Sequence, residues 1–140
     1  MRTLSALALL ALAAGCGPSA PIVTGLASEL PGSSWTLERV VLADGGVLRG
    51  DGARVTFAAD GALSISSCNE CGGRFTMADS VLSVAEPVAC TRRACTNGQV
   101  ELERYLMGES VVRRDGVYLV VEPAAGPAEQ VLLVPAATGV

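Results

Sequence analysis

The most informative feature of this 140-residue chain is what it lacks: it contains no histidine, and all ten of its basic residues are arginine. The missing histidine excludes His-based catalytic triads and His-ligated metal sites. The missing lysine excludes Schiff-base chemistry and the lysine of a phosphate-binding loop. We therefore assign no catalytic residue, and we expect neither a cofactor nor a bound metal.

Aromatic and charged residues are also scarce, at 4% and 17% of the chain. The net charge of −4 and the lack of a basic run argue against nucleic acid as a partner. The few aromatic side chains leave little surface on which bases would stack. Because half of the residues are hydrophobic, this length predicts one domain with a substantial core.

The longest apolar run, Leu4 to Ala14, has only eleven residues, whereas a membrane-spanning helix needs about 20. With Arg2 before it, the run is typical of a signal peptide covering residues 1–15. It ends in Ala-Ala-Gly-Cys, which resembles the lipobox of bacterial lipoproteins and implies cleavage before Cys16 and lipidation of that cysteine. The alternative is an ordinary secretory signal with an accidental cysteine, since Ala13 stands where leucine is commonest.

The residues after the lipobox suggest where such a lipoprotein would reside. Gly17 stands where an aspartate commonly signals inner-membrane retention, which favours the outer membrane, with the protein facing the periplasm. Fatty-acyl chains such as palmitate would provide the membrane affinity. Residues 16–33 are rich in Pro, Ser and Gly and are expected to form a flexible tether.

From Ser34 onward, short β-forming runs alternate with turn residues and predict an antiparallel domain over residues 34–135, with a tail at 136–140. Asp115-Gly116 is the strongest hairpin turn, and a second hairpin is expected to turn about Ala78 and Asp79. The expected strands lie near residues 35–42, 47–48, 54–57, 62–66, 74–77, 81–84, 111–114, 117–121 and 130–134.

One segment has helical rather than strand periodicity. Thr96 and Gln99 fit a capping box, and Leu102, Tyr105 and Leu106 share one helix face. We expect one short helix over about residues 97–107, with its apolar face in the core. The predicted fold class is α+β, mainly antiparallel β, in the form of a curved sheet or small open barrel of short strands.

Trp35 opens the expected domain, and Cys68-Asn69, Gly73, Phe75, Thr91 and Cys95 follow it in that order. This order resembles the META/HslJ domain family of small bacterial envelope proteins, over about residues 34–134. The resemblance implies the fold and an envelope location, in a family associated with heat-shock response and antibiotic tolerance and without an established enzymatic activity. Here Ser67 replaces the usual glycine before the Cys-Asn pair, and Cys71 and Cys90 are additional. The motif residues are Trp35, Cys68, Asn69, Gly73, Phe75, Thr91 and Cys95.

The four cysteines after Cys16 indicate two disulfides in an exported chain. A hairpin about Ala78 and Asp79 would place Thr76 near Val81, and so Cys71 near Glu86, a few residues from Cys90. We therefore favour the nested pairs Cys71–Cys90 and Cys68–Cys95 over the local pairs Cys68–Cys71 and Cys90–Cys95.

Two other uses of these cysteines stay open. Cys68 and Cys71 form a Cys-x-x-Cys that would serve as a thiol-disulfide redox pair, although no helix N-terminus follows to activate it. Alternatively, the four thiolates would hold zinc in a small metal-binding module.

The two arginine pairs, Arg92-Arg93 and Arg113-Arg114, are candidates for an anion-binding patch, or else are solvated loop and hairpin ends. Asn69 is expected to hydrogen-bond its local backbone at a turn. The functional hypothesis is a lipid-anchored, non-enzymatic envelope protein that is monomeric and has a binding or envelope-stress role. The sequence does not identify its protein or small-molecule partner.

Overall fold

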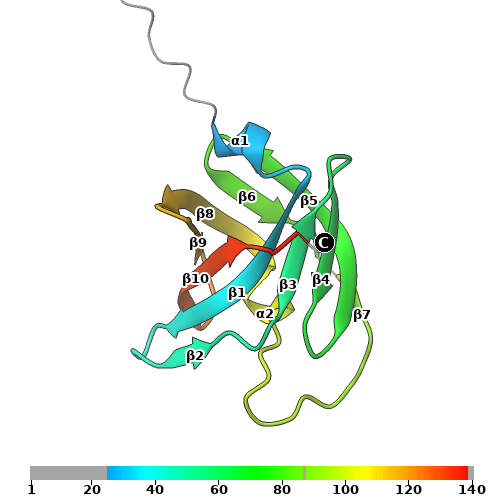
Figure 1. Cartoon of the computed structure of the whole chain (residues 1–140), viewed down its shortest axis with the longest axis vertical. Coiled ribbons are helices and arrows are strands. Elements are labelled where there is room, and N and C mark those ends of the chain that lie inside the picture. The colour runs from blue at the N-terminus through cyan, green and yellow to red at the C-terminus, as the bar shows by residue number, and fades with distance from the viewer. Residues whose placement is uncertain (1–24, 87, 139–140) are drawn as a thin grey trace, which may run out of the picture.

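Eight antiparallel strands form a closed barrel in the computed structural model, which describes residues 25–86 and 88–138 (Figure 1). Around the barrel the order is β1, β3, β4, β5, β6, β8, β9, β10 and back to β1, while the short β2 and β7 lie outside this ring. The strands are β1 Ser33–Leu42, β2 Val47–Arg49, β3 Arg54–Phe57, β4 Ala62–Ser66, β5 Glu70–Ala78, β6 Val81–Val84, β7 Ala89–Cys90, β8 Gly108–Asp115, β9 Tyr118–Pro123 and β10 Ala128–Pro135. The helices are α1 Leu26–Glu29 and α2 Glu103–Leu106.

The first and last long strands close the barrel. β1 pairs with β10 from Trp35 opposite Pro135 to Leu42 opposite Ala128. The mainly antiparallel class predicted from the sequence is confirmed, and this pairing makes the expected curved sheet a closed barrel rather than an open one. No helix in the described residues is long and apolar enough to cross a membrane.

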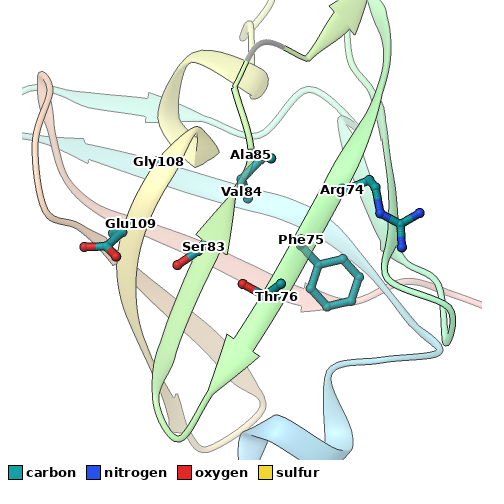
Figure 2. A pocket seen from close by; sticks show the side chains of 8 residues that line it. All are labelled: Arg74, Phe75, Thr76, Ser83, Val84, Ala85, Gly108 and Glu109. Atoms are coloured by element: carbon teal, nitrogen blue, oxygen red, sulfur yellow. The ribbon is translucent and has the colours of Figure 1, made fainter.

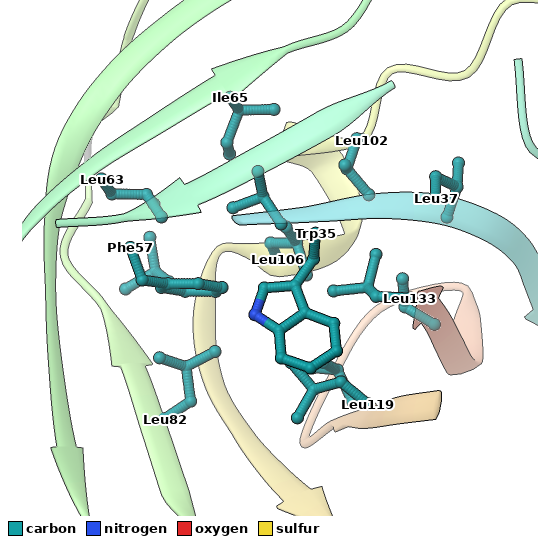
Figure 3. Packing of buried hydrophobic residues seen from close by; sticks show 14 of the residues in the cluster. Trp35, Leu37, Phe57, Leu63, Ile65, Leu82, Leu102, Leu106, Leu119 and Leu133 are labelled. Carbon is teal, nitrogen blue, oxygen red and sulfur yellow. The ribbon is translucent and has the colours of Figure 1, made fainter. Parts of the chain in front are cut away.

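Side chains fill the interior of the barrel. In strands such as β4 and β8, buried residues that point inward alternate with exposed residues that point outward, so one face of each contributes to a common core. The rings of Phe57 and Phe75 meet edge to face with centroids 5.0 Å apart. Figure 3 shows Trp35, Leu119 and Leu133 converging on the same region from different strands. The barrel is therefore a packed core.

The chain enters the barrel through α1, which covers one end of it (Figure 1). Leu30, directly after this helix, is only 1% exposed. The guanidinium of Arg114 stacks over the Trp35 ring, 4.7 Å from its centroid, and its Nε lies 3.6 Å from a carboxylate oxygen of Glu29. The predicted tether therefore ends too late, because the packed domain already includes α1. The remaining tether residues, 16–24, and the signal-peptide residues 1–15 lie outside the described residues.

The predicted helix over 97–107 is too long, because α2 covers only Glu103–Leu106. The capping pair closes an isolated turn, in which the Thr96 N–H and hydroxyl donate to Gln99 Oε1 at 2.8 and 2.9 Å. Gly98 has a φ of +91°, which ends any helix there. The expected apolar face is nevertheless in the core, since Leu102 and Leu106 are fully buried.

Both predicted hairpins form, but each has a different register. Asp115 pairs with Tyr118, so the turn residues are Gly116 and Val117 rather than Asp115 and Gly116. A turn with Gly at its first central position needs positive φ only there, and Gly116 has a φ of +60°. In the β5–β6 hairpin, Thr76 pairs with Ser83 rather than lying near Val81.

Gly50 lies where β1 exchanges one neighbour for another. β2 pairs with the second half of β1 and β3 with the first half, both on the edge opposite β10, so the link between them runs closely along β1. The Gly50 N–H donates to the carbonyl oxygen of Glu38 at 2.7 Å. A Cβ at Gly50 would overlap the carbonyl oxygen of Leu37 and lie 2.8 Å from its carbonyl carbon. Only glycine fits at this point of the link between β2 and β3.

We predict that Gly50→Ala lowers the free energy of unfolding by more than about 2 kcal/mol, because backbone atoms of β1 must move. Gly72→Ala is the matched control, since a Cβ on this β5 glycine meets nothing within 4 Å. It should leave stability unchanged or slightly raised. Urea unfolding of both variants measures the difference in stability between them. Equal midpoints would show that the link at Gly50 tolerates a side chain.

Candidate functional site

The four domain cysteines and Asn69, which the sequence singles out, gather at the end of the barrel opposite α1. The connection from β6 to β8 crosses this end and carries β7 and α2 (Figure 1). Two disulfides tie this connection to the start of β5: Cys68–Cys95, with Cα atoms 5.6 Å apart, and Cys71–Cys90, with Cα atoms 4.1 Å apart. We refer to the two bridges as the disulfide clamp.

The disulfides are the nested pairs favoured by the sequence, although the structural route differs from the expected one. The expected β5–β6 register is wrong by two residues, as described above. The pairing comes instead from β7, a separate short strand that places Cys90 directly opposite Cys71 on β5. Cys68 and Cys71 are therefore bonded to different partners, and in this oxidised state no four-thiolate zinc site forms among these cysteines.

Asn69 organises the clamp, and its side chain is 6% exposed. Its Oδ1 accepts hydrogen bonds from the Arg93 N–H at 2.8 Å and the Thr91 hydroxyl at 3.3 Å. Its Nδ2 lies 3.5 Å from Cys68 Sγ. The expectation that Asn69 bonds only to its local backbone is wrong, because its amide bridges to a segment more than twenty positions away.

The motif residues outside the clamp serve packing. Phe75 is buried against Phe57, and Trp35 is buried near the α1 end. A Cβ at Gly73 would lie 2.8 Å from Val88 Cγ1, so glycine lets the β6–β7 connection pack on β5. The motif thus divides into Cys68, Asn69, Thr91 and Cys95, which meet at the clamp, and Trp35, Gly73 and Phe75, which do not.

Glu103 is a site residue that sequence reasoning missed. It is 6% exposed, and its Oε2 accepts a hydrogen bond of 2.8 Å from the hydroxyl of Ser67. A carboxylate oxygen of Glu103 and the sulfurs of Cys71 and Cys90 all lie within 4.8 Å of one another. The sequence feature that could have indicated this site is Ser67, because its side chain places a hydroxyl where glycine is usual.

Glu101 has a different partner from Glu103. Its carboxylate lies 2.9 Å from the guanidinium of Arg104. This hydrogen bond, together with the negative charge of Glu101, raises the pKa of Arg104 above its usual value. Glu101 also lies within 4.8 Å of the Cys68 and Cys95 sulfurs, but its charge is already balanced.

Asp51 is a second residue that the sequence did not single out. Its carboxylate accepts hydrogen bonds from the N–H of Val100 at 2.8 Å and of Ala53 at 3.2 Å. Asp51 thereby fastens the connection between β6 and β8 to the link before β3. A polar cavity of about 120 Å³ lies beside it, lined in part by Ser67, Cys68 and Gln99.

Two larger hollows lie on the outer wall of the barrel. One, of about 400 Å³, is lined by Gly52, Arg54, Thr56, Ser64 and Ser66. The other, of about 260 Å³, crosses β5, β6 and β8. Figure 2 shows Arg74 and Glu109 on its opposite sides with Thr76 and Ser83 between them. The clamp and these walls are among the surfaces that the fold offers to a ligand.

The predicted anion patch is not assembled. Arg113 pairs with Asp115 and Glu122, at 3.5 and 3.3 Å, and Arg114 pairs with Glu29 at the α1 end. Arg92 and Arg93 are exposed in the segment after β7, at the opposite end of the barrel (Figure 1). The two arginine pairs therefore do not face a common ligand.

Comparison with known proteins places this architecture in a family. The family model of the META domain matches residues 28–119, about two thirds of the chain. The chain belongs to the META domain family. No curated protein sequence matches it closely enough to count as a relative.

Two solved structures share the META fold with this chain. The first, an NMR structure of a protein from Burkholderia xenovorans, has a TM-score of 0.62 and 20% identity, covering 87% of this chain and 98% of its own. The second, also an NMR structure, has a TM-score of 0.55 and 20% identity, covering 77% of this chain and 92% of its own. At this identity the likeness concerns the fold alone.

We predict that Asn69→Ala lowers the free energy of unfolding by about 1–3 kcal/mol, because the Arg93 N–H and the Thr91 hydroxyl lose their part-buried acceptor. Asn97→Ala is the matched control, since Asn97 is exposed on the same connection, and it should change stability by less than about 0.5 kcal/mol. Chemical denaturation measures both. Equal effects would show that Asn69 does not organise the clamp.

We also predict that Cys71→Ser with Cys90→Ser, and separately Cys68→Ser with Cys95→Ser, each lower stability by about 3–4 kcal/mol. The two bridges close loops with sequence separations of 19 and 27, which restricts the unfolded chain. Denaturation of each double variant is compared with the oxidised parent. A double variant as stable as the parent would show that its bridge does not stabilise the fold.

Proposed function

We propose that this META domain protein is a lipid-anchored component of the bacterial cell envelope that acts by binding and not by catalysis. The lipid on Cys16 would hold it at the outer membrane, and the barrel would face the periplasm. The observation that carries the proposal is the disulfide-clamped barrel together with the lipobox-like sequence that precedes it.

The disulfide clamp supports an extracytoplasmic location. Disulfides persist in oxidising compartments such as the periplasm and are rare in the cytosol. All four cysteines within the domain take part in the clamp. The apolar run before Cys16 supplies the export signal that such a location requires.

The filled interior supports binding at the surface. Eight-stranded barrels either hold a small ligand in the lumen or fill it with side chains. Here fully buried residues such as Phe57, Leu106 and Leu133 occupy the inside. A partner would therefore meet the outer wall or the clamped end, where hydroxyl, guanidinium and carboxylate groups line the hollows.

Labelling cells with an alkyne analogue of palmitate, followed by intact mass measurement, tests the anchor. The parent chain should incorporate the label and have the mass of a form that begins at lipidated Cys16. Cys16→Ser should lose the label and leave the membrane fraction, because its side chain lacks the thiol that carries the lipid. Ser5→Ala, within the apolar run, is the matched control and should remain labelled. An unlabelled parent chain in the soluble fraction would overturn the anchor.

Gly17→Asp tests the membrane assignment separately. If the residue after the lipidated cysteine directs sorting, this variant should remain labelled and move from the outer to the inner membrane on density-gradient separation. A parent chain already in the inner membrane would contradict the outer-membrane location while leaving lipidation intact.

A further inference from the structure

Glu103 is a buried acid that forms no direct ion pair in the described part of the chain: the neighbouring Arg104 feels its charge but pairs with Glu101. Glu103 is 6% exposed, and the ion pairs within residues 25–86 and 88–138 do not include it. Its side-chain hydrogen bond comes from the neutral hydroxyl of Ser67. Burying a carboxylate is costly unless a cation or several donors compensate it. A cation in direct contact would therefore stabilise the buried Glu103 carboxylate more than its present partner, a hydroxyl, does.

The nearest groups with metal-binding chemistry are two sulfurs. A Glu103 carboxylate oxygen, Cys71 Sγ and Cys90 Sγ all lie within 4.8 Å of one another. A tetrahedral zinc ion, with metal–sulfur bonds of about 2.3 Å and metal–oxygen bonds of about 2.0 Å, needs its ligand atoms less than about 4 Å apart. Small shifts of the two-residue β7 would bring the three atoms to that spacing once the sulfurs are no longer bonded to each other.

The second bridge is less suited to a metal. Cys68, Cys95 and Glu101 meet the same distance criterion, but Glu101 already pairs with Arg104 at 2.9 Å. Cys68 and Cys95 also lie next to the Nδ2 group of Asn69, a hydrogen-bond donor that satisfies sulfur without a cation. Of the two sets, only the one that contains Glu103 has a carboxylate outside a direct ion pair.

We propose that reduction of the Cys71–Cys90 bridge creates a binding site for a thiophilic divalent cation such as Zn²⁺. The ligands are the thiolates of Cys71 and Cys90 and the carboxylate of Glu103, with a water molecule in the fourth position. The Ser67 hydroxyl orients the carboxylate, as hydrogen-bonded groups behind a metal ligand commonly do. Asn69 continues to hold the connection in place, because its side-chain oxygen accepts hydrogen bonds from Thr91 and Arg93.

The reductant is a dithiol of the thiol-disulfide reductase class. Its thiolate attacks Cys90 Sγ, because Cys90 is exposed whereas Cys71 is 5% exposed. The sulfur–sulfur bond breaks, Cys71 leaves as a thiolate and takes a proton from water, and the second thiol of the reductant releases Cys90 and closes the reductant's own disulfide. Two electrons pass to the protein. On binding, the cation displaces the remaining thiol protons, and two metal–sulfur bonds form.

Cadmium serves as the probe, because Cd²⁺ binds as Zn²⁺ does and its bonds to sulfur give a charge-transfer absorption. The chain carries Cys16→Ser, so that the only thiols are those of the clamp, and is reduced with a phosphine. Native mass spectrometry should find one Cd²⁺ per reduced chain and none on the oxidised chain. Glu103→Gln should weaken the affinity at least about tenfold, since even groups that only orient a ligand contribute ten- to hundredfold. Glu101→Gln is the matched control and should bind as the parent does.

Two double variants assign the sulfurs. The chain with Cys68→Ser and Cys95→Ser should still bind one Cd²⁺, whereas the chain with Cys71→Ser and Cys90→Ser should bind none. Loss of Cd²⁺ from the first variant would overturn the proposal in favour of a four-thiolate site. Equal affinity of Glu103→Gln and Glu101→Gln would also overturn it. If reduction unfolds the chain, circular dichroism decides: Cd²⁺ should restore the β signal, and failure to bind or refold would overturn the site.

Discussion

The pairing of β1 with β10 is the constraint on which the rest of the structure depends. It joins the first and last long strands, so every inward-facing residue shares one interior and neither strand keeps a free edge there. The interior is then filled by side chains such as Phe57 and Leu133. A barrel closed and filled in this way leaves only its outer wall and its two ends for recognition.

The two ends of the barrel are held by different kinds of interaction. At one end, α1 is fixed by the burial of Leu30 and by Arg114, which contacts both Trp35 and Glu29. At the other end the long connection between β6 and β8 has little regular structure, so covalent bonds and the Asn69 amide hold it. Cys90, Cys95 and Glu103 all lie in this less regular segment. Two disulfide bonds, and not packing alone, therefore fix its position.

Particular residues show how far sequence reasoning reached. The strands at residues 54–57, 62–66 and 81–84 agree closely with alternation, because each buries one face in the core. The Asp115-Gly116 turn was misplaced by one residue, since Gly116 alone supplies the positive φ that the turn needs. The predicted helix begins too early because the pattern of a capping box also closes an isolated turn. The hydrogen bond from the Val100 N–H to Asp51, a tertiary contact, shows that the chain forms a turn here and not a helix.

The sequence by itself determined the chemistry that is excluded, the β class, the inward face of alternating strands such as β3 and β4, and the family, because composition and alternation are local properties of the chain. Only the tertiary structure decided that β1 meets β10, that Asn69 bridges to Arg93, and that Glu103 lies beside the Cys71–Cys90 sulfurs. Each of these contacts joins residues more than ten positions apart. Their proximity follows from barrel closure and from the path of one irregular connection, neither of which leaves a periodic trace in the sequence.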